Sequence, residues 1–206
     1  MGRRLVSELL RENFDLVALA RPGSEHKLPA GSQIAFGSAL DANTYANRVG
    51  GSDTFIHLIG ASHPSPAKAR EFREVDLKSV AEALKAAKAA GSIQHFVYVS
   101  VAQPAPVMKA YTKARFEAES LIRASGIPAT ILRPWYVLGP GHRWPMVLIP
   151  FYWVLERLPG TRESAQRLGL VTIDQMTAAL VGAVKHPCSG ECRIAGVPEI
   201  RAAIFA

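Results

Sequence analysis

The sequence predicts an α/β domain in which helices cover both faces of a parallel sheet. Short apolar runs of strand length alternate along the chain with amphipathic segments of helical period, an order that is typical of parallel sheets. The runs are also nearly continuous rather than alternating, as in FDLVALA at 14–20 and HFVYVSV at 95–101. Strands of this kind are expected where both faces of the sheet are buried.

The first predicted element is a helix that begins almost at the first residue and ends at Asn13. Leu5 and Leu9 recur at helical spacing, and charged residues occupy the other side of the helix. A buried strand at 14–20 follows, then a weaker strand at 32–36 and a short helix at 40–49.

The rest of the chain continues the alternation. We expect further strands and helices over the ranges 54–60 (strand), 68–90 (helix), 95–101 (strand), 108–125 (helix), 129–134 (strand) and 168–173 (strand). A last helix is predicted after Thr172, because Thr172 and Gln175 have the spacing of a capping box. His57 stands on an apolar strand and is expected to be a core residue.

Composition excludes several classes of protein. The chain has 206 residues, 49% of them hydrophobic, and a formal net charge of +7. Its basic residues are scattered, which favours a solvated surface over a nucleic-acid interface, although an anionic partner stays open. No segment is long enough to span a bilayer and no targeting signal is evident, so we expect a cytoplasmic protein. Cys188 and Cys192 are expected to be free thiols, and no metal constellation is present.

A parallel sheet that begins with a helix is unusual. In a doubly wound fold the first helix follows a first strand, and the turn between them carries glycines that approach a pyrophosphate. Here Gly2 directly precedes the helix. We therefore expect that the first strand and most of a glycine-rich loop are missing. We also expect that a chain starting at Met1 is unstable alone unless another segment or subunit fills the gap.

Several segments carry a family resemblance, among them VALARPGS at 17–24, FIHLIG at 55–60 and FVYVSV at 96–101. Gly2-Arg3-Arg4-Leu5-Val6 looks like the end of a G-x-x-G-x-x-G loop entering its helix, and AYTKARFEAESLIRASGIPATILRPWYVLGPG at 110–141 contains the most specific match. The sequence resembles the extended and atypical short-chain dehydrogenase/reductases, including NmrA-like proteins and nucleotide-sugar epimerase relatives. The resemblance implies a Rossmann-like sheet, with an incomplete NAD(P)-binding part at 1–134 and a small substrate-side region at 135–206.

The resemblance assigns cofactor contacts residue by residue. Gly2 matches the last glycine of the loop, and Arg21 follows the second strand of the family. A cation at that position favours the 2′-phosphate of NADP(H) over NAD(H), although Arg21 could equally be a surface residue. The strand end at Leu58, Ile59 and Gly60 matches the part that lies along adenine and ribose, or is simply strand core. Without the glycine loop, cofactor binding is itself in question.

The catalytic signature of the family is altered. Its Tyr-x-x-x-Lys motif places both side chains on one helix face, and the cation lowers the pKa of the tyrosine. Here Tyr111 is followed at that spacing by Arg115, whose planar guanidinium does not reproduce an ammonium. Ser100 lies near the position of the family's third residue, which falls closer to Ala102. Tyr111, Arg115 and Ser100 are the candidate catalytic and nicotinamide-side residues, with a purely hydrogen-bonding Tyr111 as the alternative.

The segment after the strand at 129–134 matches the loop that closes over nicotinamide. Pro134 is the cofactor candidate there, and the candidate substrate residues are Trp135, Tyr136, His142 and Arg143. An arginine, a histidine and aromatic rings could form a pocket for an anionic or ring-bearing ligand. A packed loop with a solvated His–Arg pair is the alternative.

Three functions stay open at this point. One is an NADP-dependent oxidoreductase or epimerase-like enzyme. Another is a non-catalytic NAD(P)-sensing or assembly protein, which suits the altered signature. The last is an interaction protein without cofactor, whose apolar segment 144–155 contacts a protein partner, a second copy of the chain or a membrane surface. The small-molecule substrate is not defined by the sequence.

Overall fold

The computed structural model describes residues 1–61, 65–104, 108–139, 166–190 and 192–203. Its strands are β1 (Val17–Ala20), β2 (Gln33–Phe36), β3 (Thr54–His57), β4 (His95–Val99), β5 (Ala129–Leu132), β6 (Tyr136–Leu138), β7 (Leu170–Thr172) and β8 (Cys192–Ala195). Its helices are α1 (Gly2–Arg11), α2 (Ala69–Glu71), α3 (Lys78–Ala90), α4 (Lys109–Ala124), α7 (Ile173–Lys185) and α8 (Val197–Ala202). None of the described helices is both long enough and apolar enough to cross a membrane.

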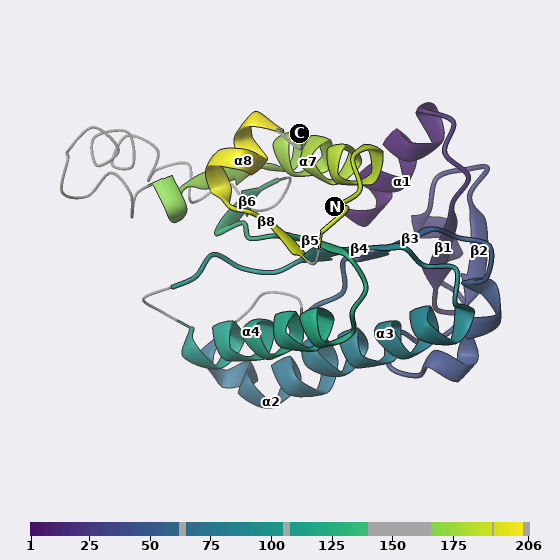
Figure 1. The fold of residues 1–206 in the computed structure, drawn as a ribbon, viewed down its shortest axis with the longest axis horizontal. Helices are drawn as coiled ribbons and strands as arrows, with labels where there is room; N and C mark the ends of the chain where they lie inside the picture. The colour runs from purple at the N-terminus through teal and green to yellow at the C-terminus, as the bar shows by residue number, and fades with distance from the viewer. Residues whose placement is uncertain (62–64, 105–107, 140–165, 191, 204–206) are drawn as a thin grey trace.

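Every pairing between the described strands is parallel. Four strands form one sheet in the order β3-β4-β5-β8, while β1 pairs with β2 and β6 pairs with β7. Helices α1, α7 and α8 cover one face and α2, α3 and α4 cover the other (Figure 1). This arrangement confirms the predicted α/β fold with helices on both faces of a parallel sheet.

Side chains of β4 alternate between two apolar clusters. Val97 packs with α1, α7 and α8 on one face, whereas Phe96 and Tyr98 pack with α3 and α4 on the other, and all three are fully buried. Burial on both faces explains why the strand has an almost continuous apolar sequence. His57 is buried as predicted, with its Nε2 atom 3.1 Å from Ser79 Oγ.

The sheet is divided between β1 and β3. Among the described strands, β1 pairs only with β2, and β3 pairs only with β4. Helix α1 comes before β1, as predicted, and packs against α7. In a doubly wound order the first strand lies between the second and the fourth. The division therefore falls where the sequence was expected to lack a strand.

Two predicted helices differ from the structure. The helix expected at 40–49 consists instead of two 3₁₀ turns, Ala42–Thr44 and Ala46–Arg48. Asp41 and Thr44 bond nearby backbone groups there, which favours turns over a continuous helix. The helix expected at 68–90 is interrupted by a π-helical segment, Phe72–Leu77, which turns Phe72 and Asp76 into the interior.

The C-terminal part contains more regular structure than the sequence predicted. Helix α7 begins with the expected capping box, because Thr172 Oγ1 accepts the Gln175 N–H at 3.1 Å and Gln175 Oε1 accepts the Thr172 N–H at 2.9 Å. Strands β6 and β8 and helix α8 were not expected. Strand β8 pairs with β5, so the chain after residue 135 also contributes to the main sheet. Cys188 and Cys192 are free thiols.

Candidate functional site

A cavity of about 210 Å³ lies at the carboxyl ends of β3, β4 and β5. In open α/β sheets, ligands bind beyond this end of the strands. Residues from four parts of the chain line it: Met1; Leu58, Gly60 and Ala61; Val99, Ser100, Val101, Tyr111 and Arg115; and Pro134, Trp135 and Val137.

The cavity gathers most of the positions that the resemblance singled out. The residues in question are Leu58, Gly60, Ser100, Tyr111, Arg115, Pro134 and Trp135, which are far apart in sequence. Gly2 lies beside it, since a Cβ added at Gly2 would be 3.9 Å from Leu58 Cδ1.

Other predicted residues lie elsewhere. Ile59, Tyr136 and Arg21 do not line the cavity: Tyr136 begins β6, and Arg21 is exposed directly after β1. His142, Arg143 and the segment 144–155 lie outside the described residues.

Helix α4 presents Tyr111 and Arg115 on one face, as their spacing requires. The Tyr111 ring packs edge-on against Phe72, with 5.1 Å between ring centroids. The Arg115 guanidinium carbon lies 5.2 Å from the centroid of the Tyr111 ring, within the range of a cation–π contact. Lys113 is exposed, in keeping with its place on another side of the helix.

The Arg115 guanidinium is already engaged by protein groups. Its Nη2 atom lies 2.7 Å from Asp76 Oδ1, and its Nη1 donates to the Val99 carbonyl at 2.9 Å and to the Tyr98 hydroxyl at 3.2 Å. The Arg115 and Asp76 side chains are only 8% and 0% exposed. Burial raises the pKa of the Asp76 carboxyl, and the adjacent guanidinium opposes that shift.

Ser100 is held by a second buried carboxylate. Its hydroxyl donates to Glu119 Oε1 at 2.6 Å, and the same carboxylate accepts from Gln103 Nε2 at 3.3 Å and from Arg133 Nε at 3.0 Å. Arg123 Nη2 lies 3.2 Å from Glu119 Oε2. Because an ionised carboxylate only accepts hydrogen bonds, the Ser100 proton points toward Glu119 rather than into the cavity.

Sequence reasoning missed Asp76, Glu119 and Arg133. Glu119 stands four residues after Arg115 and eight after Tyr111, so helical spacing already placed it on the same face of α4. Asp76 carried no comparable signal, because it faces inward only through the π-helical segment that changes the register of its helix.

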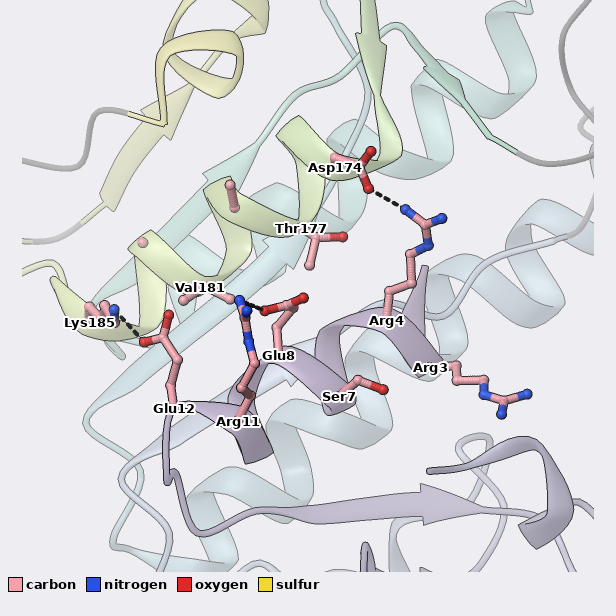
Figure 2. Close-up of a pocket in the computed structure, with 12 residues that line it drawn as sticks. Arg3, Arg4, Ser7, Glu8, Arg11, Glu12, Asp174, Thr177, Val181 and Lys185 are labelled. Atoms are coloured by element: carbon pink, nitrogen blue, oxygen red, sulfur yellow. Dashed lines mark hydrogen bonds and ion pairs between the residues drawn. The ribbon is translucent and has the colours of Figure 1, made fainter. Parts of the chain in front are cut away.

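A larger groove of about 740 Å³ lies between α1 and α7. Figure 2 shows that charged side chains along it form three pairs, Arg4 with Asp174, Arg11 with Glu8 and Lys185 with Glu12, whereas no pair is marked for Arg3. Its acidic side chains are thus already neutralised, and the groove is open to solvent. The smaller cavity remains the better candidate, because it lies at the strand ends and contains buried polar groups.

Comparison with known proteins identifies the family of the chain. A family model described as NAD(P)H-binding matches residues 1–142. No curated protein matches the sequence.

Solved structures share the fold at low sequence identity. A UDP-galactose 4-epimerase superposes with a TM-score of 0.70 at 15% identity, covering 94% of this chain and 72% of that one. A short-chain dehydrogenase/reductase superfamily protein from Agrobacterium tumefaciens with bound NAD gives 0.65 at 18% identity, covering 98% and 79%. A UDP-glucuronic acid 4-epimerase from Bacillus cereus in complex with NAD gives 0.66 at 18% identity, covering 95% and 73%.

Proposed function

Because this chain belongs to the NAD(P)H-binding family, within the short-chain dehydrogenase/reductase superfamily, we propose that it binds NADP(H). The proposed site is the cavity at the ends of β3, β4 and β5. In this proposal the protein is a non-catalytic sensing or assembly protein. The observation that carries this proposal is the ion pair between Arg115 and Asp76. Arg115 stands at the spacing of the family's catalytic lysine from Tyr111, and in this ion pair its charge is bound by a carboxylate of the protein itself.

The hydrogen bonds around the cavity support binding without the tyrosine-based reaction. Such a reaction needs a cation that lowers the tyrosine pKa and a hydroxyl that polarises the substrate carbonyl. Arg115 donates to Asp76, Tyr98 and Val99, and Ser100 donates to Glu119. Both Nη atoms of Arg115 and the Ser100 hydroxyl are thus engaged by protein groups, and the Arg115 Nε–H, which has no hydrogen-bond partner, is buried. The apolar wall formed by Leu58, Val137 and Trp135 is suited to hold a ring.

Arg21 supports the preference for NADP(H). It follows Ala20, the last residue of β1, and is exposed, so its guanidinium is free to meet a phosphate on the adenine ribose. Charge-assisted hydrogen bonds of this kind contribute about 1.5–3 kcal/mol.

Replacing Arg21 by alanine should therefore weaken NADPH binding about tenfold or more and leave NADH binding unchanged. Titrations that follow the fluorescence of NADPH and NADH measure both dissociation constants, and Arg48→Ala, another exposed arginine, is the control. Equal affinity of the unsubstituted protein for the two cofactors would contradict the NADP(H) preference. Failure to bind either would contradict the proposed function.

An NADP-dependent oxidoreductase or epimerase-like enzyme is the second candidate. Tyr111 lines the cavity, and the Arg115 guanidinium lies over its ring, at the spacing of the family's catalytic pair. In that function Trp135 and Tyr136, from the proposed substrate-side region 135–206, would face the substrate.

Tyr111→Phe separates the two candidates. For a non-catalytic protein, we expect NADPH to be consumed no faster with protein than without it across a panel of carbonyl compounds and nucleotide sugars, and Tyr111→Phe to bind NADPH as the unsubstituted protein does. An enzyme would show turnover that falls about 100- to 10,000-fold in Tyr111→Phe. Absorbance of NADPH measures the first quantity and fluorescence titration the second.

A further inference from the structure

The turn after β3 is held by a buried carboxylate from the π-helical segment Phe72–Leu77. The Ala61 N–H donates to Asp76 Oδ2 at 2.9 Å, and the second oxygen of the carboxylate pairs with Arg115. Ala61 lines the cavity together with Gly60. One carboxylate therefore fixes the backbone of the cavity wall and the guanidinium beside it.

Arg115 connects the same turn to the end of β4. Its Nη1 donates to the Val99 carbonyl, and Val99 also lines the cavity. The guanidinium packs directly under Gly60: a Cβ at that residue would lie 2.0 Å from Arg115 Nη2 and 3.1 Å from Asp76 Oδ1. Only glycine leaves room for the guanidinium at this position of the turn.

The two side chains thus join the turn after β3, the end of β4, the π-helical segment and α4. We propose that Asp76 and Arg115 form a clamp that fixes the Gly60–Ala61 turn and thereby sets the affinity of the cavity for its cofactor. They act as positioning residues, through the backbone that they hold. The second half of this proposal rests on the proposed function, because it takes NADPH as the ligand.

The chemistry of the clamp explains the arginine at this position. A guanidinium donates from a planar fork and can reach Asp76, Val99 and Tyr98 at once, whereas an ammonium is a compact charge on a flexible stem. The ion pair also neutralises two charges that would be costly to bury alone. Arg115 therefore has a structural use that a lysine would fill incompletely.

The test follows the Ala61 amide by hydrogen exchange and NADPH by fluorescence titration, in the full chain. Asp76→Asn keeps the shape of the side chain and removes its charge, while Arg115→Lys keeps the charge and removes the fork. We expect both variants to exchange the Ala61 amide about tenfold faster and to bind NADPH about tenfold more weakly. The Val97 amide in the core should be unchanged, which shows that the variant is folded.

Glu117→Gln is the matched control, because Glu117 lies on the same helix and pairs with Arg73 at 3.6 Å on the surface. It should alter neither quantity. The clamp is overturned if Asp76→Asn and Arg115→Lys leave Ala61 exchange unchanged, or if exchange rises while NADPH affinity stays the same. If one of the two variants fails to fold, the other supplies the result.

Failure of the proposed function would look different. The unsubstituted protein would then bind no NADPH. Faster exchange of the Ala61 amide in the two variants would still show that the clamp fixes the turn, and unchanged exchange would show that it does not.

Discussion

Replacing Glu119 by alanine is expected to lower the free energy of unfolding by about 3–5 kcal/mol. The Glu119 side chain is 0% exposed and accepts hydrogen bonds from Ser100, Gln103 and two arginines. Alanine would leave Arg133, itself only 19% exposed, without its charge partner. It would also leave the Ser100 hydroxyl without its acceptor. Removing one member of a buried charged network lowers the free energy of unfolding by more than the whole network adds to it. The reason is that the remaining polar groups stay buried without a partner.

Equilibrium unfolding in urea, followed by circular dichroism, measures the effect. Glu117→Ala is the matched control on the same helix, since its surface ion pair with Arg73 should contribute about 0–1 kcal/mol. Glu119→Gln, which keeps the size and one acceptor oxygen, should fall between the two. A loss for Glu119→Ala no larger than that for Glu117→Ala would show that the network does not stabilise the fold.

The face of α4 that carries Glu119 takes part in two buried networks. Tyr111, Arg115 and Glu119 follow one another at four-residue intervals, and the last two enter separate buried networks. Arg115 holds the ends of β3 and β4, and Glu119 holds the ends of β4 and β5 through Ser100 and Arg133. In both networks a position near the expected catalytic group has become part of the scaffold, which is why the proposed function is binding rather than catalysis.

The elements that hydrophobic periodicity predicted well are those with long apolar runs. Strand β4 and helices α1 and α4 were found within a few residues of their expected bounds, because burial on one or both faces leaves a regular pattern in the sequence. The 3₁₀ turns at 42–48 differed because local hydrogen bonds of Asp41 and Thr44 outweigh a weak apolar pattern. Strands β6 and β8 are too short to show a period and are defined by their pairing with β7 and β5.

The candidate site was predictable to a different extent. The resemblance placed Gly60, Ser100, Tyr111 and Arg115 in one region, and the cavity brings them together. Which partners these side chains contact could not be inferred, because Asp76 reaches Arg115 from an irregular, π-helical segment that packs beside α4. Residue identity therefore indicated the location of the site, whereas tertiary hydrogen bonds decide what the site can do.

Stability should fall by about 4 kcal/mol between about pH 7 and about pH 5, half of it from each of two buried histidines. Burial lowers the pKa of His57 to about 3, with a further decrease from the nearby Arg115, and lowers the pKa of His95 to about 4. Each pKa lies below the value of about 6.5 in the unfolded chain. As the pH falls the unfolded state therefore takes up protons first, and the stability present above about pH 6.5 is lost progressively down to the folded pKa.

The hydrogen bonds around His57 agree with a neutral ring. The Ser79 hydroxyl donates to the Asp76 carbonyl at 3.1 Å, so it accepts from His57 Nε2, and this bond needs only the neutral tautomer that carries the proton on Nε2. A second proton would add a charge close to Arg115 in the interior.

Urea unfolding at the two pH values measures the loss of unfolding free energy. For His57→Gln this loss should be about 2 kcal/mol smaller than for the unsubstituted protein, because glutamine does not titrate. His26→Gln, at an exposed position, is the control for the removal of a histidine. If His57→Gln keeps the full pH dependence, burial does not lower the pKa of His57. The folded protein then carries a protonated His57 at about pH 5, and the buried region around Arg115 and Asp76 accommodates a second cation.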